Sequence, residues 1–167
     1  MAEAALQVHN IPPLYDERSR VLVLGSFPSV KSREAKFFYG HPQNRFWKVA
    51  AAITQEPAVQ TIPEKKALAL SHGLAMWDVI GQCVITGSSD TSIRDVVPND
   101  IRLILEAAPI QVIACNGTKS YELYQKYLLP LTGREALRLP STSPANATYS
   151  LERLTKEWGE ALKEYLL

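Results

Sequence analysis

Short, unbroken runs of apolar residues recur along the chain, and longer stretches with helical spacing separate them. Residues 21–24 and 112–115 are such runs, residues 136–139 form a third that Arg138 interrupts, and residues 73–80 return as a fourth strand that leads into a loop. Apolar runs without polar alternation are typical of strands that are covered on both faces. We therefore predict four strands, the first of which ends at Gly25, where glycine gives the backbone the freedom to turn.

Helices are predicted between these strands. Apolar residues at mixed helical spacing predict helices over residues 44–55, 62–70, 98–105, 118–129 and 150–167. Pro63 lies near the start of the second helix, and Gly73 follows its end, which are favoured positions for these residues. Residues 6–19 are expected to form an extended lead-in, and residues 86–92 a polar connection.

The alternation of strands and helices predicts an α/β fold. We expect a three-layer α/β/α sandwich with a central, mostly parallel four-stranded sheet, in a single domain over residues 1–167. Ligands of such sheets bind outside the carboxyl ends of the strands. Three polar segments, residues 25–29, 116–117 and 140–146, each directly follow a predicted strand, so we expect them to converge.

Composition narrows the class of protein. The formal net charge is +1, no stretch has the apolar length of a membrane helix, and residues 1–4 lack a signal-peptide pattern. We expect a cytoplasmic protein, nucleoid-associated if the source is a prokaryote, with no membrane contact. Cys83 and Cys115 are far apart in apolar runs, which indicates buried thiols. No His, Cys, Asp or Glu spacing indicates a metal site, and no cofactor is expected.

The charge distribution is more informative than the net charge. Five cations, Lys31, Arg33, Lys36, Arg45 and Lys48, lie between positions 31 and 48 with only Glu34 against them. Aromatic residues at 37–39 lie among them, and rings interleaved with cations suit a stacked base and its phosphates. An ordinary solvated charged face is the alternative interpretation of the same cations.

The chain resembles a known family at three motifs. Gly25-Ser26-Phe27-Pro28-Ser29, Tyr39-Gly40-His41-Pro42-Gln43-Asn44-Arg45-Phe46-Trp47 and Pro140-Ser141-Thr142-Ser143-Pro144-Ala145-Asn146 resemble the motif set of the uracil-DNA glycosylase superfamily, and most closely its hypoxanthine-DNA glycosylase (DNA-deoxyinosine glycosylase) branch. The resemblance runs from about His9 to the last helix.

This resemblance implies a monofunctional, monomeric DNA N-glycosylase in base excision repair. It would flip a deaminated base, first of all hypoxanthine, out of DNA and hydrolyse its N-glycosidic bond, leaving an abasic site. Two alternatives stay open: a glycosylase of the same fold that acts on uracil or xanthine, and a non-catalytic nucleic-acid-binding α/β domain. An esterase-like hydrolase is disfavoured because the chain lacks a Gly-x-Ser-x-Gly elbow.

Asn44 is the expected catalytic residue. Glycosidic cleavage passes through an oxocarbenium-like sugar cation, so an amide carbonyl that positions water can assist it. A helix N-cap is the alternative role for this asparagine, and the resemblance favours catalysis. Related branches carry an Asp or Asn at the place of Phe27, where a phenyl ring cannot hold water. This difference disfavours strong activity on uracil.

Asn116 is expected to read the base. One side-chain amide can match the ring N–H and carbonyl of hypoxanthine, whereas adenine presents the opposite pattern. A simple Asn-Gly turn is the alternative. Tyr39 matches the place where related glycosylases stack a ring on the flipped base, and Phe27, Gly25 and Ser26 are expected beside it.

The remaining expected contacts are with the DNA backbone. The resemblance implies that the loop after the last strand grips DNA and fills the gap left by the extruded base. The expected DNA-binding residues are Ser29, Lys31, Ser32, Arg45, Ser141, Thr142, Ser143, Pro144, Ala145 and Asn146. Asp78 is expected to brace a loop, His41 to form a structural hydrogen bond, and His9 to lie away from the strand ends.

Overall fold

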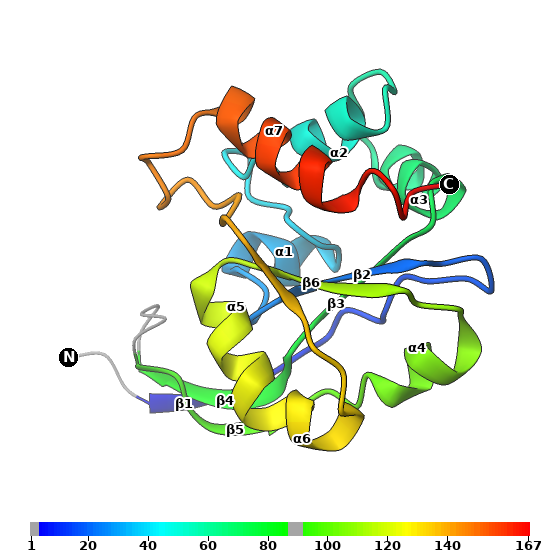
Figure 1. Ribbon diagram of the computed structural model, residues 1–167. Coiled ribbons are helices and arrows are strands. Elements are labelled where there is room, and N and C mark those ends of the chain that lie inside the picture. Colours follow the sequence, from blue (N-terminus) through cyan, green and yellow to red (C-terminus); the bar gives the residue numbers. More distant parts are fainter. Residues whose placement is uncertain (1–3, 87–91) are drawn as a thin grey trace.

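A four-stranded parallel sheet forms the centre of the computed structural model, which describes residues 4–86 and 92–167 (Figure 1). Its strands lie in the order β3 (Leu74–Asp78), β2 (Val21–Gly25), β6 (Val112–Asn116) and β7 (Leu137–Leu139), and each neighbouring pair is parallel. The predicted strands and the predicted parallel sheet are therefore confirmed.

Helices cover both faces of this sheet. Helices α2 (Phe46–Ile53), α3 (Ile62–Ser71) and α7 (Leu151–Leu162) lie on one side, and α4 (Arg102–Ala107), α5 (Thr118–Leu123) and α6 (Leu129–Thr132) on the other (Figure 1). This is the predicted three-layer α/β/α arrangement. A parallel sheet with both faces covered needs apolar strands, which explains the unbroken runs in the sequence.

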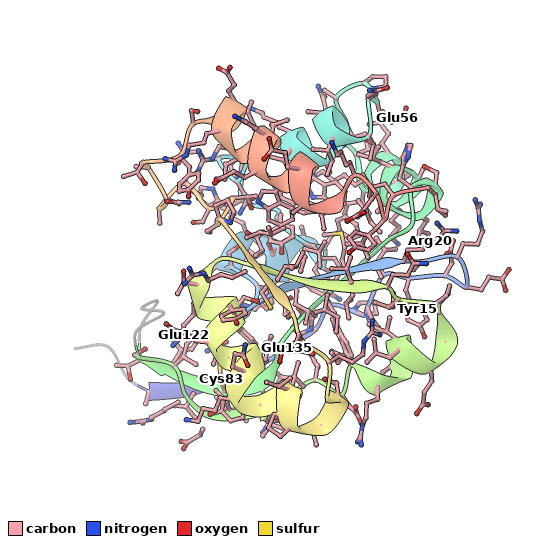
Figure 2. The ribbon with its side chains drawn as sticks, viewed as in Figure 1. Tyr15, Arg20, Glu56, Cys83, Glu122 and Glu135 are labelled. Carbon is pink, nitrogen blue, oxygen red and sulfur yellow. The ribbon has the colours of Figure 1, made fainter. Side chains whose placement is uncertain are left out.

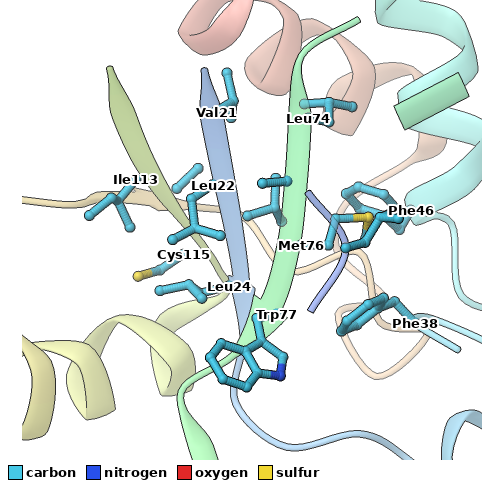
Figure 3. Close-up of a cluster of buried hydrophobic side chains, with 14 of the residues drawn as sticks. Val21, Leu22, Leu24, Phe38, Phe46, Leu74, Met76, Trp77, Ile113 and Cys115 are labelled. Carbon is cyan, nitrogen blue, oxygen red and sulfur yellow. The ribbon is translucent and has the colours of Figure 1, made fainter. Parts of the chain in front are cut away.

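The core is centred on β2, which is buried at all five positions. Leu22 of this strand lies beside Ile113 of β6 on one face of the sheet, and Met76 of β3 lies beside Phe46 of α2 on the other (Figure 3). Each fully buried side chain of this size contributes about 1.5–3 kcal/mol relative to an exposed one. The rigid strand β2 therefore fixes the position of the turn that follows Gly25.

A second, antiparallel sheet was not predicted. Strands β1 (Ala4–Val8), β4 (Ile80–Thr86) and β5 (Arg94–Pro98) form it in the order β1-β4-β5. The prediction of an extended lead-in without a strand was wrong, because β1 pairs with β4, a partner far away in sequence. Strand β4 follows β3 after one residue, so the sequence pattern of the two strands resembles that of a single strand. Residues 87–91, which make up most of the predicted polar connection, lie outside the described residues.

Helix boundaries differ where local signals were ambiguous. Helix α1 (Val30–Ala35) was not predicted, although Ser29 caps it through its side-chain oxygen. Helix α4 begins at Arg102 because Pro98 belongs to β5. Residues Tyr124–Leu128 form a π-helical turn between α5 and α6, and the last helix ends at Leu162. A Thr61–Glu64 capping box starts α3 at the predicted residue.

Charged side chains lie around the outside of the fold. Glu56, Glu122 and Glu135 are exposed, and Figure 2 shows Glu56 and Arg20 at its margin. Cys83 and Cys115 are both buried, as predicted. Burial raises the pKa of the Cys115 thiol to about 12, so this thiol is no nucleophile. No helix in the described part of the chain is long and apolar enough to cross a membrane.

Candidate functional site

A large cavity opens at the carboxyl ends of the four parallel strands. Its volume is about 1020 Å³, and its walls come from the turn after β2, the end of β3, the β6–α5 turn and the β7–α7 loop. The three polar segments of the sequence therefore converge, as predicted. In Figure 1 the orange β7–α7 loop lies on the side of the molecule where β2 ends.

Most of the sequence-predicted residues line this cavity. The lining includes Gly25, Ser26, Phe27, Ser29, Ser32, Tyr39, Asn44, Asn116, Ser141, Thr142, Ser143, Pro144, Ala145 and Asn146. Lys31 and Arg45 are not among the lining residues. Lys31 is exposed on α1, where its ammonium lies 3.8 Å from the Glu34 carboxylate.

Thr142 joins the two asparagines of the site. Its hydroxyl donates to Asn44 Oδ1 at 2.9 Å and accepts from Asn116 Nδ2 at 3.0 Å, while its backbone N–H donates to Asn116 Oδ1 at 3.0 Å. Thr142 is fully buried, so its side chain braces the site from inside. This differs from its expected place among the residues that face DNA, because the whole side chain is enclosed by these bonds.

The Asn44 amide has one polar atom left for other partners. Its Oδ1 accepts from the backbone N–H of Phe46 at 2.9 Å as well as from Thr142. Both lone pairs of Oδ1 are engaged, so the carbonyl has no free lone pair with which to position the water, as the sequence had predicted it would. Nδ2 has no hydrogen bond to any described residue and remains available to the cavity. The bond to Phe46 also supports the start of α2, although the N-cap position itself is Arg45 and not Asn44.

Asn116 is held more firmly than the sequence indicated. Both of its amide atoms pair with Thr142, which leaves one acceptor lone pair and one N–H for a base. The following Gly117 has φ +98°, and a Cβ there would lie 3.0 Å from Cβ of Ser141. A glycine is therefore needed both for this turn and for the close approach of the β7–α7 loop.

Arg45 is the anchor of the β7–α7 loop. Its guanidinium donates to the carbonyl oxygens of Ser143 at 2.9 Å and Asn146 at 3.1 Å, and also to those of Thr142 and Tyr149. A guanidinium with these donors engaged has little capacity left for a phosphate, which was its predicted partner. Pro144 and Ala145 are exposed at the tip of the anchored loop.

Ser29 and Ser32 shape the first turn of α1. The Ser29 side chain accepts from the backbone N–H of Ser32, and the Ser32 hydroxyl accepts from the backbone N–H of Gly40 at 2.8 Å. Ser32 is only 2% exposed, so it holds the Tyr39-Gly40 turn in place. Ser29 is exposed at the cavity edge.

Tyr39 lies in the cavity wall with an unusual backbone. Its φ of 53° is in the left-handed region, which a residue with a large side chain adopts at a cost of about 1–3 kcal/mol. The ring stacks on Phe46 with centroids 4.5 Å apart. Its hydroxyl is buried and has no hydrogen-bond partner among the described residues. Burial raises the pKa of this phenol far above its usual range, the Asp78 charge raises it further, and the nearby Asn116 amide partly offsets both.

Phe27 faces the same cavity and is packed from two sides. The His9 ring meets it edge-on at 6.1 Å, and the Arg33 guanidinium lies 5.3 Å from its ring centroid. Arg33 also donates to Gln7 Oε1 on β1. Strand β1 thus supports one wall of the cavity, a contribution that could not be foreseen while β1 itself was missed.

Sequence interpretation missed the pairing of His9 with Asp78. His9 Nε2 lies 2.8 Å from Asp78 Oδ2, and the two side chains are only 3% and 5% exposed. Asp78 ends β3 in register with Gly25 and lines the cavity. An acidic residue at the carboxyl end of a buried parallel strand was the signal available in the sequence. The described residues contain no cluster of three or more His, Cys, Asp or Glu side chains that could hold a metal ion.

Comparisons with known proteins agree on one family. The family model of the uracil DNA glycosylase superfamily matches residues 12–166. A hypoxanthine DNA glycosylase of Methanosarcina acetivorans is 36% identical over 149 residues, 88% of this chain and 92% of that protein. A hypoxanthine DNA glycosylase of Methanosarcina barkeri is 32% identical over 160 residues, which cover 95% of this chain and 99% of that protein. The solution NMR structure of a uracil DNA glycosylase candidate from Methanosarcina acetivorans has a TM-score of 0.81 at 31% identity, covering 96% of this chain and 99% of that one.

Proposed function

Because the chain belongs to the uracil DNA glycosylase superfamily, we propose that it is a monofunctional DNA N-glycosylase that excises hypoxanthine from deoxyinosine in DNA. The observation that carries this proposal is the Thr142-linked pair of Asn44 and Asn116 in the wall of a cavity of about 1020 Å³. The two relatives named hypoxanthine DNA glycosylase, which match over more than nine tenths of their own length, support the choice of base.

The substrate base has to leave the duplex before it can reach the cavity. Extrusion costs a few kcal/mol and costs least for a mispaired base, which favours a deaminated base over an undamaged one. The cavity volume suits one nucleotide, and the exposed tip of the β7–α7 loop, Pro144 and Ala145, is available to occupy the gap in the stack. Arg45 keeps this loop in one conformation from inside the protein.

Cleavage then needs a positioned water and a stabilised sugar cation. Asn44 is the proposed water-positioning residue: its free Nδ2–H holds the water through one lone pair, and the other lone pair attacks C1′ of the deoxyribose. Thr142 and the Phe46 N–H keep the amide in this orientation. The C1′–N bond breaks, its electron pair goes to the base, and the proton of the water passes to solvent. The protein forms no covalent intermediate in this scheme.

Base recognition is proposed for the side chains around Gly25. Asn116 offers one N–H and one lone pair, Tyr39 offers a hydroxyl that has no hydrogen-bond partner in the described part of the chain, and Phe27 provides an apolar face. A site whose polar groups are left unpaired by the wrong base can reject it by about 10⁴-fold or more. Uracil and xanthine share the N–H and carbonyl edge of hypoxanthine, so glycosylases for these bases are the nearest alternative functions.

Single-turnover cleavage of labelled duplexes that contain inosine, uracil, xanthosine or adenosine tests the proposal. We expect alkali-dependent breakage at inosine, its loss in Asn44→Ala, and its retention in Asn10→Ala, which changes an exposed asparagine that is not among the lining residues. Breakage at uracil alone would replace the proposed substrate. Tight DNA binding without breakage at any base would indicate a non-catalytic binding module instead.

A further inference from the structure

One buried carboxylate of the cavity has no role in the scheme above. Asp78 Oδ2 lies 2.8 Å from His9 Nε2. The other ring nitrogen of His9, Nδ1, accepts from the backbone N–H of Ile11 at 3.3 Å. Nδ1 therefore carries no proton, and Nε2 is the nitrogen that donates to Asp78. This bond fixes the carboxylate from behind and leaves its second oxygen to the cavity.

The second oxygen of Asp78, Oδ1, lies against Gly25, where a residue with a side chain would not fit. A Cβ on Gly25 would collide with Asp78 Oδ1 and would lie 3.3 Å from the Tyr39 hydroxyl. No described residue donates a hydrogen bond to Oδ1, and the Tyr39 hydroxyl also lacks a described partner. An acceptor and a hydroxyl thus lie close together, both without a partner among the described residues, which is the arrangement expected of a ligand-contacting surface.

The negative charge of Asp78 has little compensation. Among the described residues, no Lys or Arg lies within 4.0 Å of its carboxylate, and His9 reaches it through the Nε2–H hydrogen bond. The backbone around it is also fixed: Asn99 Nδ2 donates to the Asp78 carbonyl oxygen at 2.9 Å, and the Val79 N–H donates to the Gly25 carbonyl oxygen at 2.9 Å. A base in the cavity therefore meets a fixed, partly buried anion, whose field is strong because little water screens it.

Bases differ in the charge with which they leave the sugar. A purine has a basic ring nitrogen, N7, which can take a proton from solvent; when the C1′–N9 bond breaks, the electron pair goes to N9 and the base departs neutral. Uracil has no basic ring nitrogen, so the electron pair of its C1′–N1 bond leaves it as a monoanion. A fixed carboxylate favours departure of a neutral purine, because it attracts the protonated purine. It opposes departure of uracil, because it repels the anion.

We propose that Asp78, held by His9, is a specificity-determining residue that favours bases leaving neutral, such as hypoxanthine, over bases leaving as anions, such as uracil. Its Oδ1 accepts a ring N–H of the purine beside Gly25. This inference rests on the proposed glycosylase activity, but it is a statement about a ratio of rates on two lesions. Asp78 is thus more than the loop brace that its sequence position indicated.

The test compares single-turnover cleavage of inosine and uracil duplexes by the parent and by Asp78→Asn, which removes the charge and keeps an oxygen for His9. We expect the inosine-to-uracil ratio of rates to fall by about tenfold or more. Asp100→Asn makes the same change at an exposed aspartate that does not line the cavity, so it serves as the matched control and should keep the ratio. Equal losses on both lesions, or an unchanged ratio, would overturn the proposal and leave Asp78 a structural brace.

A second arm uses the unmodified protein and does not depend on the folding of a variant. In 7-deazainosine a carbon replaces N7, so the base keeps its N–H and carbonyl edge but cannot be protonated there. We expect the parent to cleave a 7-deazainosine duplex at least about a hundredfold more slowly than an inosine duplex. Cleavage at the inosine rate would contradict the proposal. A parent that cleaves no inosine at all would instead refute the glycosylase function itself, so the two failures are distinguishable.

Discussion

Thr142 donates its hydroxyl to Asn44 at 2.9 Å, although the two residues lie 98 positions apart in the chain. Through the same hydroxyl and its own N–H, Thr142 also holds Asn116. Three motifs from different parts of the sequence are thereby tied together at one fully buried residue. The orientation of both asparagines depends on a side chain that cannot itself reach DNA.

Thr142→Val tests this connection. Valine has nearly the same shape but leaves the Asn44 and Asn116 amides each without one hydrogen bond, so we expect the free energy of unfolding to fall by about 1–3 kcal/mol. A misplaced amide should also slow inosine cleavage by about a hundredfold. Thr148→Val, at an exposed position of the same loop, is the control. Parent-like cleavage by Thr142→Val would show that the link does not position the asparagines.

Asn44→Asp distinguishes the two atoms of the amide. The aspartate keeps an oxygen for Thr142 and Phe46 but loses the Nδ2 donor. We expect it to lose about as much single-turnover rate as Asn44→Ala, on the order of a hundredfold. If the rate instead rose or stayed the same, the oxygen and not the nitrogen would be the atom that serves the water.

Tyr39→Phe separates binding from stability. Its hydroxyl is buried without a described partner, so its removal should leave the free energy of unfolding unchanged or raise it by about 1–3 kcal/mol. Removing the hydroxyl should at the same time slow inosine cleavage by about tenfold, because a buried contact to the base is lost. Tyr165→Phe, in the turn after α7, is the control. A clear loss of stability in Tyr39→Phe would mean that the hydroxyl has a partner after all.

The dependence of stability on alkaline pH provides an independent measure of how deeply the Tyr39 hydroxyl is buried. The pKa of Tyr39 is raised above its ordinary value near 10, so the unfolded chain releases this proton before the folded protein does. Tyr39 therefore contributes stability that is present below pH 10 and is lost as the pH rises above it. We expect urea unfolding midpoints to fall less steeply above pH 10 in Tyr39→Phe than in the parent. Parallel curves would show that the phenol is not desolvated.

Arg45→Lys tests the anchor of the β7–α7 loop. Lysine keeps the charge but cannot reproduce a planar fork that serves several carbonyl oxygens. We expect faster amide hydrogen exchange over residues 141–149 and affinity for abasic-site DNA about tenfold weaker, because the loop has to be ordered on binding. Lys48→Ala, an exposed change on α2, should do neither. Unchanged exchange in Arg45→Lys would refute the anchoring role.

The sequence was sufficient for the parts of the fold that local patterns specify. Four apolar strands, the parallel sheet and the layers of helices followed from apolar runs and their separation. The small antiparallel sheet did not, because β1 pairs with β4 across 74 to 82 positions and neither strand shows a clean alternation. Non-local pairing of this kind depends on partners that a local pattern cannot identify.

The site shows the same division. Motifs at strand ends identified the cavity residues, since parallel strands bring their carboxyl ends together. The individual roles were harder to predict. Arg45 and Thr142 carry polar groups suited to DNA, but their partners are backbone and side-chain atoms inside the protein. His9 meets Asp78 only because β1 joins the second sheet, so this pair could not be found before that sheet was known.

The central claim is that this chain releases hypoxanthine from DNA by hydrolysis. The most direct measurement is chromatography with mass detection of the free bases released from one duplex that carries inosine and uracil at defined positions, with Asn44→Ala run alongside the parent. We predict free hypoxanthine in equal amount to the abasic sites formed, and little of either from Asn44→Ala. Release of uracil without hypoxanthine, or of no base at all, would contradict the account.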